Sequence, residues 1–129
     1  MTSPAEAETF EIQMLNKGEA GAMVFEPAFV AAQVGDTVTF LSIDKGHNAE
    51  SIEGMLPAGV EAFASKLNEE FSMTLTEEGV YGVKCKPHYM MGMVAVIQAG
   101  SPVNLEEAKA VKHKGKAKSH FVELLAQVE

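Results

Sequence analysis

The amino-acid sequence predicts an all-β protein, a β-sandwich or barrel, with two small helices packed on at its C-terminal end. Two observations predict this fold class. Up to about Ala99, short segments with apolar residues at every second position are separated by glycine-containing turns, which is the pattern of strands. After Gly100, apolar residues recur at helical spacing instead. Several short strands with regular turns favour a sandwich or a barrel.

The length and composition are those of a small globular protein. A chain of 129 residues is short of the size at which chains usually split, so we expect one domain over residues 1–129. The strands are expected over about residues 10–99 and the helices over about 102–128. A hydrophobic content of 47% and a mean hydropathy near zero are those of an ordinary folded protein.

The first half of the chain contains three expected strands. In the first, Phe10, Ile12 and Met14 share one face. The segment NKGEAGAMVFEP that follows is irregular in pattern, and AFVAAQ then leads into a turn at Val34-Gly35-Asp36. The next strand is expected over residues 37–43, with Val38 and Phe40 on one face.

The second half contains three more expected strands after a long crossover loop. The loop covers residues 49–68, and we expect a helical turn in it at residues 60–65. The segment FSMTLT then alternates, EEG turns the chain, and MVAVIQ forms the last strand. Between them, VYGVKC directs Tyr81, Val83 and Cys85 to the core side. This alternation places the single cysteine at the end of a strand, facing inward.

The two C-terminal helices are predicted from capping and spacing. Asn104 followed by Glu107 is typical of a helix N-cap with its capping-box partner. Apolar residues follow at helical spacing in two groups. They are Leu105, Ala108 and Val111 in the first helix, and Phe121, Leu124, Leu125 and Val128 in the second.

The charge and hydropathy exclude some partners. The formal net charge is −8 and every basic residue is lysine, so we expect no nucleic acid among the partners. No apolar run approaches the roughly 20 residues that span a bilayer, so we expect no membrane partner. Five lysines lie between Lys109 and Lys118, and we interpret them as the solvated face of the terminal helices. We also interpret His113 and His120 as solvated side chains and not as ligands.

The residues themselves do not indicate the cellular compartment. The first ten residues, MTSPAEAETF, lack the basic start and apolar stretch of a signal peptide. A lone cysteine also excludes an internal disulfide framework, the usual sign of an oxidising compartment.

A constellation of metal-ligand types stands in the stretch VKCKPHYMMGMVAV. Cys85 offers a thiolate, His88 an imidazole and Met93 a thioether, within a loop short enough to curl them around one point. His47, in DKGHNAE, follows the end of an earlier strand and could reach the same end of a sandwich. Each of these residues alone would more often be structural. Four potential ligands at compatible strand ends have no shared packing reason.

The combination of ligands indicates copper. Two imidazoles, one thiolate and a weak axial thioether form the set found at electron-transfer copper sites. A structural zinc more typically uses four cysteine or histidine ligands, and a catalytic zinc leaves an open position. Neither accounts for a methionine ligand such as Met93.

Two other classes of function use the same residues. A copper storage or delivery protein would also use cysteine and methionine, but should exchange its metal readily. An enzyme with a cysteine nucleophile could pair Cys85 with His47 or His88. Because the ligand set leaves no open coordination position, we expect an electron carrier and not an enzyme.

Several segments together resemble the pseudoazurins, within the cupredoxins. The segments, in order, are MLNKG, AMVFEPAFV, GDTV, DKGHN, SKLNE and VKCKPHYMMGM. The resemblance runs from about Ile12 through the C-terminal helices. It implies a Greek-key β-sandwich with two C-terminal helices and one type 1 copper ion. The ligands it implies are His47, Cys85, His88 and Met93. Met93 closes the family pattern His-Tyr-x-Met-Gly-Met, whereas Met90 and Met91 do not.

Two neighbours of the ligands are expected to support the site. Asn48 is placed to join the two ligand loops by hydrogen bonding, and a backbone N–H donated to the Cys85 thiolate would raise the reduction potential. Pro87 removes a backbone donor and stiffens the loop between Cys85 and His88.

Transient docking to redox partners is expected around His88. We expect its ring edge to be the electron port, and the resemblance implies an apolar collar of Met23, Pro87 and Met91. A ring of lysines near the ligand loops should attract acidic partners. These lysines are Lys17, Lys45, Lys66, Lys84 and Lys86.

The resemblance also implies the partners and the compartment. It implies a periplasmic protein of bacterial denitrification, its signal peptide removed, that acts as a monomer. Its partners would be copper nitrite reductase and c-type cytochromes. The sequence departs from the family at Glu53 and Ala64, where relatives often carry lysine, and at Lys86, where threonine is common. The basic patch is therefore expected to be displaced.

Overall fold

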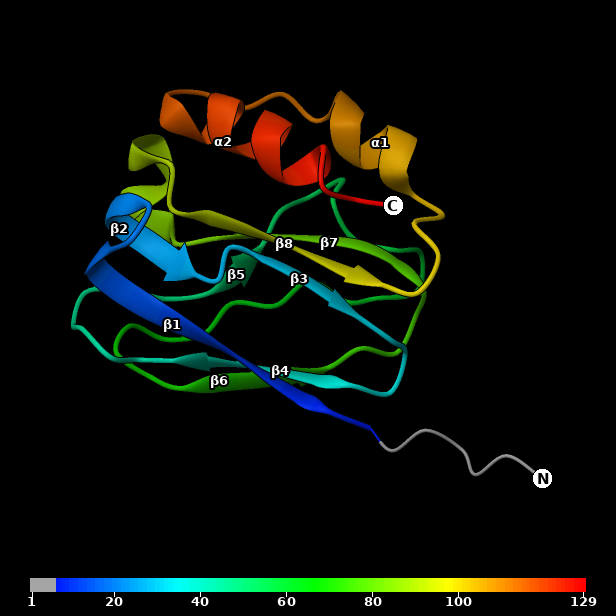
Figure 1. Cartoon of the computed structure of the whole chain (residues 1–129), viewed down its shortest axis with the longest axis horizontal. Coiled ribbons are helices and arrows are strands. Elements are labelled where there is room, and N and C mark those ends of the chain that lie inside the picture. Colours follow the sequence, from blue (N-terminus) through cyan, green and yellow to red (C-terminus); the bar gives the residue numbers. More distant parts are fainter. Residues whose placement is uncertain (1–6) are drawn as a thin grey trace.

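The fold is built from two four-stranded sheets stacked face to face (Figure 1). The structure, a computed structural model, describes residues 7–129. The first sheet has the order β2-β1-β4-β6 and the second the order β3-β8-β7-β5. The strands are β1 Thr9–Gly18, β2 Gly21–Glu26, β3 Phe29–Ala32, β4 Thr37–Leu41, β5 Glu50–Ser51, β6 Phe71–Thr74, β7 Gly79–Lys84 and β8 Val94–Ala99.

Each sheet combines parallel and antiparallel pairs. In the first sheet β1 pairs parallel with β4, and β2 and β6 add antiparallel on either side. In the second sheet β3 pairs parallel with β8, while β7 pairs antiparallel with both β8 and β5. Each parallel pair joins two strands that are distant in the sequence. Between the two strands of each pair, the chain crosses to the other sheet and returns.

The main core lies between the two sheets. Ile12 and Met14 of β1 and Val38 and Phe40 of β4 are fully buried in it, as the alternating pattern predicts. The ring of Phe40 packs edge-on against Phe25 of β2 at a centroid distance of 5.6 Å. The predicted inward row of Tyr81, Val83 and Cys85 belongs to the same core.

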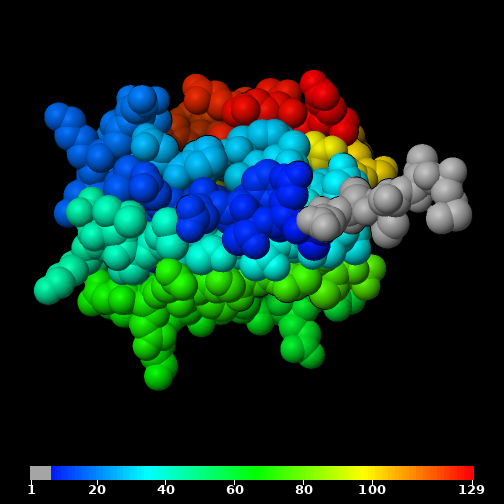
Figure 2. Space-filling view, turned by 60° about the horizontal axis from the view of Figure 1, so that its bottom comes forward, coloured from blue at the N-terminus to red at the C-terminus, as the bar shows by residue number. Residues whose placement is uncertain are grey.

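A second core lies on the outer face of the β3-β8-β7-β5 sheet. There α1 (Leu105–Ala110) and α2 (Lys116–Leu125) cover the sheet. Phe121 of α2 packs with Val80, Val94 and Val96 of the strands. Because both faces of this sheet are covered, every residue of β8 is buried. Figure 2 shows the red C-terminal end of the chain, which includes part of α2, and the green segment around residues 60–75 on opposite sides of the molecule.

The interpretation of residues 16–27 as irregular is wrong, because they form most of a hairpin. Strand β1 continues to Gly18, and β2 pairs with it from Gly18↔Gly21 to Gln13↔Glu26. The two glycines and the left-handed backbone of Met23, with φ of 54°, interrupt the alternating pattern. The hydrogen bonds between β1 and β2 nevertheless hold these residues in strands.

The predicted helical turn at residues 60–65 is also wrong. Ala64 forms an isolated antiparallel bridge with Glu50 instead. The Ser51 backbone N–H donates to the Phe63 carbonyl at 2.9 Å, and the Phe63 N–H donates to the Ser51 hydroxyl at 3.0 Å. The segment therefore runs extended along β5.

The predicted capping box at Asn104 does not form. Asn104 precedes α1 without a side-chain capping hydrogen bond. Its side-chain amide instead pairs with one residue of β7, accepting from the Val80 N–H at 2.6 Å and donating to the Val80 carbonyl at 2.9 Å. Asn104 thus fastens the start of α1 to the sheet.

None of the helices in residues 7–129 is both long and apolar enough to cross a membrane.

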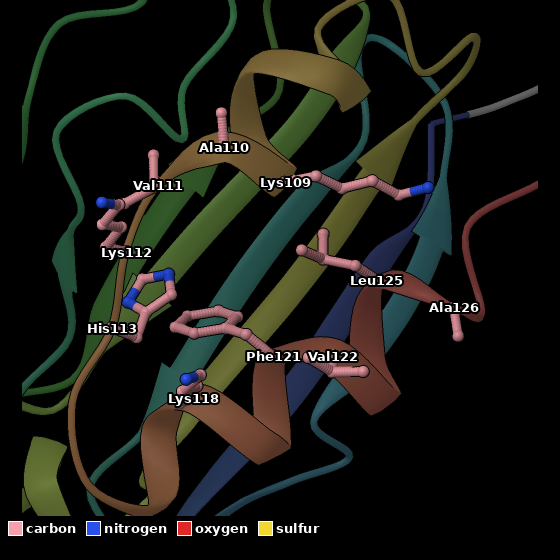
Figure 3. A pocket seen from close by; sticks show the side chains of 10 residues that line it. All are labelled: Lys109, Ala110, Val111, Lys112, His113, Lys118, Phe121, Val122, Leu125 and Ala126. Atoms are coloured by element: carbon pink, nitrogen blue, oxygen red, sulfur yellow. The ribbon is translucent and has the colours of Figure 1, made fainter.

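A groove of about 860 Å³ lies between α2 and the segment that joins the two helices (Figure 3). Its apolar lining includes Val111, Phe121 and Leu125. Lys109, Lys112 and Lys118 line it as well, and all three are exposed, as expected for the solvated face of the helices.

Candidate metal centre

Strand pairing brings two distant segments together at one end of the sandwich. Cys85 follows β7 directly and precedes the 3-10 helix η1 (Lys86–Met91), which contains His88. Met93 stands immediately before β8. His47 lies in the loop between β4 and β5, and the pairing of Glu50 with Lys84 draws this loop alongside Cys85.

The side chains of His47, Cys85 and His88 converge. The Cys85 Sγ lies 3.7 Å from His47 Nδ1 and 3.6 Å from His88 Nδ1. The two imidazole rings have a centroid distance of 4.9 Å. Within residues 7–129 this is the one group of three histidine, cysteine or acidic side chains close enough to hold a metal, with its ligand atoms within 4.8 Å of one another.

These distances fit a trigonal metal site. Metal bonds of about 2.3 Å to a thiolate and about 2.0 Å to an imidazole, the lengths found at zinc sites, would place the two ligand atoms about 3.7 Å apart at an angle of about 120°. The sulfur-to-nitrogen distances of 3.7 Å and 3.6 Å agree with that separation. The position of the Cys85 thiol relative to both imidazoles therefore suits a bound metal ion.

Burial separates Met93 from its neighbours. Met93 is completely buried beside Cys85 in the main core, and the Cys85 backbone N–H donates to the Met93 carbonyl at 3.0 Å. Met90 and Met91 are 56% and 46% exposed. Of the three methionines that follow His88, Met93 is therefore the one suited to a buried site, as the family pattern implies.

Asn16 fixes the tautomer of His47 and is a residue that the sequence reasoning missed. The Oδ1 of Asn16 lies 2.8 Å from His47 Nε2. Because an amide oxygen only accepts, Nε2 carries the hydrogen and Nδ1 keeps a free lone pair toward Cys85. Only the segment MLNKG, which contains Asn16, could have drawn attention to it.

Burial controls the protonation of the cluster. It raises the pKa of the Cys85 thiol, opposed by hydrogen bonds from the backbone of Asn48 and His88. Burial, and then the neighbouring His88, lower the pKa of His47, while Asp44 acts in the opposite direction. His47 is therefore kept neutral, as a metal ligand must be, and the thiol must release its proton when metal binds.

The expected hydrogen bond between the ligand segments is present. The Lys86 backbone N–H donates to Asn48 Oδ1 at 2.8 Å. The Asn48 amide group donates in turn to Glu50 Oε1 and to the Ser65 carbonyl, at 3.2 and 3.3 Å. Asn48 is therefore held on both sides, and it holds the start of η1 against the His47 loop.

Comparison with known proteins assigns the family. Residues 12–100 match the family of copper binding proteins, plastocyanin/azurin family. The chain is 54% identical to the pseudoazurin of Paracoccus pantotrophus, an alignment covering 99% of this chain and 89% of that protein. The chain belongs to the pseudoazurin family. It is also 45% identical to the pseudoazurin of Methylorubrum extorquens, over 99% of this chain and 87% of that protein.

Solved pseudoazurin structures have the same fold. The native pseudoazurin from Hyphomicrobium denitrificans superposes with a TM-score of 0.90 at 43% identity, covering 94% of this chain and 98% of that one. The predicted cupredoxin sandwich with two C-terminal helices is thus confirmed.

Family membership decides the class of function. Pseudoazurins are copper electron-transfer proteins and not enzymes, so the alternative of a cysteine nucleophile does not apply. His47, Cys85, His88 and Met93 form the arrangement of a type 1 copper site. The predicted cofactor, copper, is confirmed.

The interpretation of His113 and His120 as solvated is wrong. Both are only partly exposed, and both are hydrogen bonded to the segment that carries His88. His113 Nδ1 lies 2.6 Å from the Tyr89 hydroxyl, and His120 Nδ1 lies 2.8 Å from the Gly92 carbonyl. Neither belongs to the metal-binding cluster.

Proposed function

We propose that this chain shuttles single electrons in the bacterial periplasm as a monomer, with copper nitrite reductase as its acceptor in denitrification and c-type cytochromes among its partners. One observation carries the proposal: two imidazoles and a thiolate converge beside a buried methionine, and only one of the four residues reaches the surface. Bound copper supplies a one-electron couple there.

His88 is the proposed electron port. His47, Cys85 and Met93 are completely buried, whereas His88 is partly exposed. Electron transfer needs only close approach of the partner, and the exposed edge of this ring offers the shortest route from the buried site. Pro87 and Met91, next to His88 in the same segment, are exposed as an apolar collar would require, and Met23 is half-buried.

The proposed lysine ring is supported by hydrogen bonds that gather its segments. The Asn68 N–H donates to the His47 carbonyl at 3.0 Å, and the Gly46 N–H donates to Asn68 Oδ1 at 2.7 Å. These bonds place residues 66–68 beside residues 45–47. The contact of Asn16 with His47 likewise places the neighbouring residue 17 close to the His47 loop. Four lysines are exposed in these segments and in η1: Lys17, Lys45, Lys66 and Lys86.

Lys84 is the weakest member of the ring. It is partly buried, its ammonium lies 3.8 Å from the Glu50 carboxylate, and it also lies 5.2 Å from the centroid of the Tyr89 ring. A charge that is already paired attracts a partner less strongly than a free one. We therefore assign the steering of acidic partners to the four exposed lysines.

The test is the rate of electron transfer from the reduced protein to copper nitrite reductase at increasing ionic strength. The bimolecular rate constant should fall with added salt, because salt screens exposed charges. Lys→Ala changes at Lys17, Lys45, Lys66 and Lys86 should lower it further. The matched control is Lys→Ala at Lys109, Lys112, Lys114 and Lys118, four exposed lysines of α1, α2 and the segment between them, which removes an equal charge. Equal effects of the two sets, or no effect of salt, would refute the docking proposal.

A further inference from the structure

We infer that His113 and His120 are positioning residues, which hold the ligand loop, defined as residues 86–92, in the geometry that the copper site needs. Both come from the C-terminal segment, defined as residues 113–120, which joins the two helices and begins α2. This inference rests on the copper function proposed above, and it assigns a role in that function to a part of the chain outside the metal-binding cluster.

His120 holds the far end of the ligand loop. Its Nδ1 donates to the Gly92 carbonyl at 2.8 Å. Gly92 has φ of 89°, and a Cβ built there would collide with the His120 ring, so only glycine allows this approach. The residue after Gly92 is Met93, which means that His120 fixes the backbone immediately before the thioether ligand.

His113 holds the middle of the ligand loop. The Tyr89 hydroxyl is hydrogen bonded to His113 Nδ1 at 2.6 Å. The His113 ring in turn packs on Phe121 at a centroid distance of 4.3 Å, and Figure 3 shows the two rings next to each other. Tyr89 directly follows the ligand His88, so the tyrosine links the second core to a copper ligand.

A third contact shows that the two segments run side by side between these hydrogen bonds. Gly115, with φ of 61°, caps the start of α2. A Cβ built at Gly115 would lie 2.6 Å from the Met90 carbonyl oxygen. The backbones therefore approach as closely as glycine permits. The C-terminal segment touches the ligand loop at Tyr89, Met90 and Gly92.

The ligand loop needs this support because it contributes little to the core. None of the residues of η1 is buried, so the hydrophobic packing that fixes Cys85 and Met93 does not fix His88. The short internal bonds of the loop, such as His88 N–H to the Cys85 carbonyl at 3.2 Å, set its local shape but not its place on the molecule. Asn48 holds the start of the loop, and the C-terminal segment supplies the placement of its middle and far end.

The test compares paired variants by how readily the loop opens in the metal-free protein. Cys85 is the only cysteine of the chain and is fully buried, so its alkylation rate reports opening of the site. His120→Leu and His113→Leu remove the hydrogen bonds. His120→Asn and His113→Asn keep a donor or an acceptor near the position of Nδ1. Leu125→Ala, in the second core away from the loop, is the control for a general loss of stability.

We expect the alkylation rate to rise roughly two- to tenfold in each leucine variant, the factor expected when one hydrogen bond is lost from an opening equilibrium. The asparagine variants should recover most of the parental rate. Tyr89→Phe should raise the rate as His113→Leu does, and the double variant should add little, because both remove the same bond. After copper loading, the leucine variants should also differ from the parent in visible absorption and reduction potential.

The outcomes separate this inference from the proposed function. If the parent forms a coloured copper site and the leucine variants match it in alkylation rate, absorption and potential, the positioning role is wrong and the copper function stands. Increases no larger than that of Leu125→Ala, after correction for global stability, would also overturn the positioning role. If the parent forms no coloured site, the proposed function fails, and the metal-free alkylation rates still decide whether the two histidines hold the loop.

Discussion

Lys86 and Asn48 are 38 positions apart, yet the Lys86 backbone N–H donates to Asn48 Oδ1 at 2.8 Å. This hydrogen bond joins the segment that carries His47 to the segment that carries Cys85 and His88. It therefore fixes the separation of ligands that the chain itself holds far apart. Asn48 is only 6% exposed, which makes the bond difficult for water to replace.

Removing the Asn48 side chain should weaken the apposition of the ligand segments. Asn48→Ala leaves the Lys86 N–H without its acceptor, and we expect the free energy of unfolding to fall by about 1–3 kcal/mol. Urea denaturation of the metal-free protein measures this change. Asn48→Asp, which keeps an acceptor, should lose less. A stability of Asn48→Ala equal to that of the parent would contradict this role.

Asn16 should affect metal affinity through His47. Asn16→Ala removes the acceptor of the His47 Nε2–H, so the imidazole is no longer held with Nδ1 toward Cys85. We expect the affinity for copper to fall about 10- to 100-fold, the usual cost of losing a partner of a ligand histidine. Competition with a chelator of known affinity measures it. Asn16→Asp, which retains the acceptor, should stay near the parent, and a similar loss in both variants would argue against the tautomer explanation.

Lys86 should raise the reduction potential. A positive charge next to the Cys85 and His88 ligands favours the reduced, more electron-rich site. Because Lys86 is exposed, the effect is screened and should shrink as salt is added. Lys86→Thr should therefore have a lower potential than the parent in voltammetry at low ionic strength. The control is Lys112→Thr on the helical face, and an unchanged potential in Lys86→Thr would count against the prediction.

His113 should make stability depend on pH. Burial, and then the charge of Lys84, lower the pKa of His113 below its ordinary value of about 6.5. Above pH 6.5 the ring is neutral in both the folded and the unfolded chain. As the pH falls below about 6.5, the unfolded chain takes up the proton first, so this contribution to stability is lost until the folded pKa is passed.

The measurement is the free energy of unfolding of the metal-free parent and of His113→Asn between pH 7.5 and 5. The parent should lose more stability than His113→Asn over this range, and the difference between the two isolates His113 from the other histidines. Parallel curves would show that His113 does not titrate differently in the folded and unfolded chains.

The sequence predicts the fold well wherever one face of a strand is buried. Ile12, Met14, Val38 and Phe40 alternate because the sandwich core requires it, and all four are buried as predicted. The prediction fails where hydrogen bonding decides the structure. Thus the hairpin around Met23 follows from strand pairing, and the Asn104 side chain binds the backbone of Val80 in β7 in place of its own helix.

The site is predictable in its ligands but not in its support. Cys85, His88 and Met93 lie close enough in sequence for their chemistry to be recognised, and His47 follows from the family pattern. The roles of Asn16, His113 and His120 depend on contacts between segments 24 to 31 positions apart, which no local pattern encodes. Their hydrogen bonds become visible only when the strands and helices are in place.

The central claim is that Cys85, the two histidines and Met93 hold one copper ion that changes valence without leaving the protein. The most direct measurement is the visible absorption of the purified protein loaded with one equivalent of Cu(II), before and after reduction, alongside Cys85→Ser. The account predicts a strongly coloured protein that bleaches on reduction and regains its colour on oxidation, and a colourless Cys85→Ser variant. A colourless parent, or a variant with the same spectrum as the parent, would contradict it.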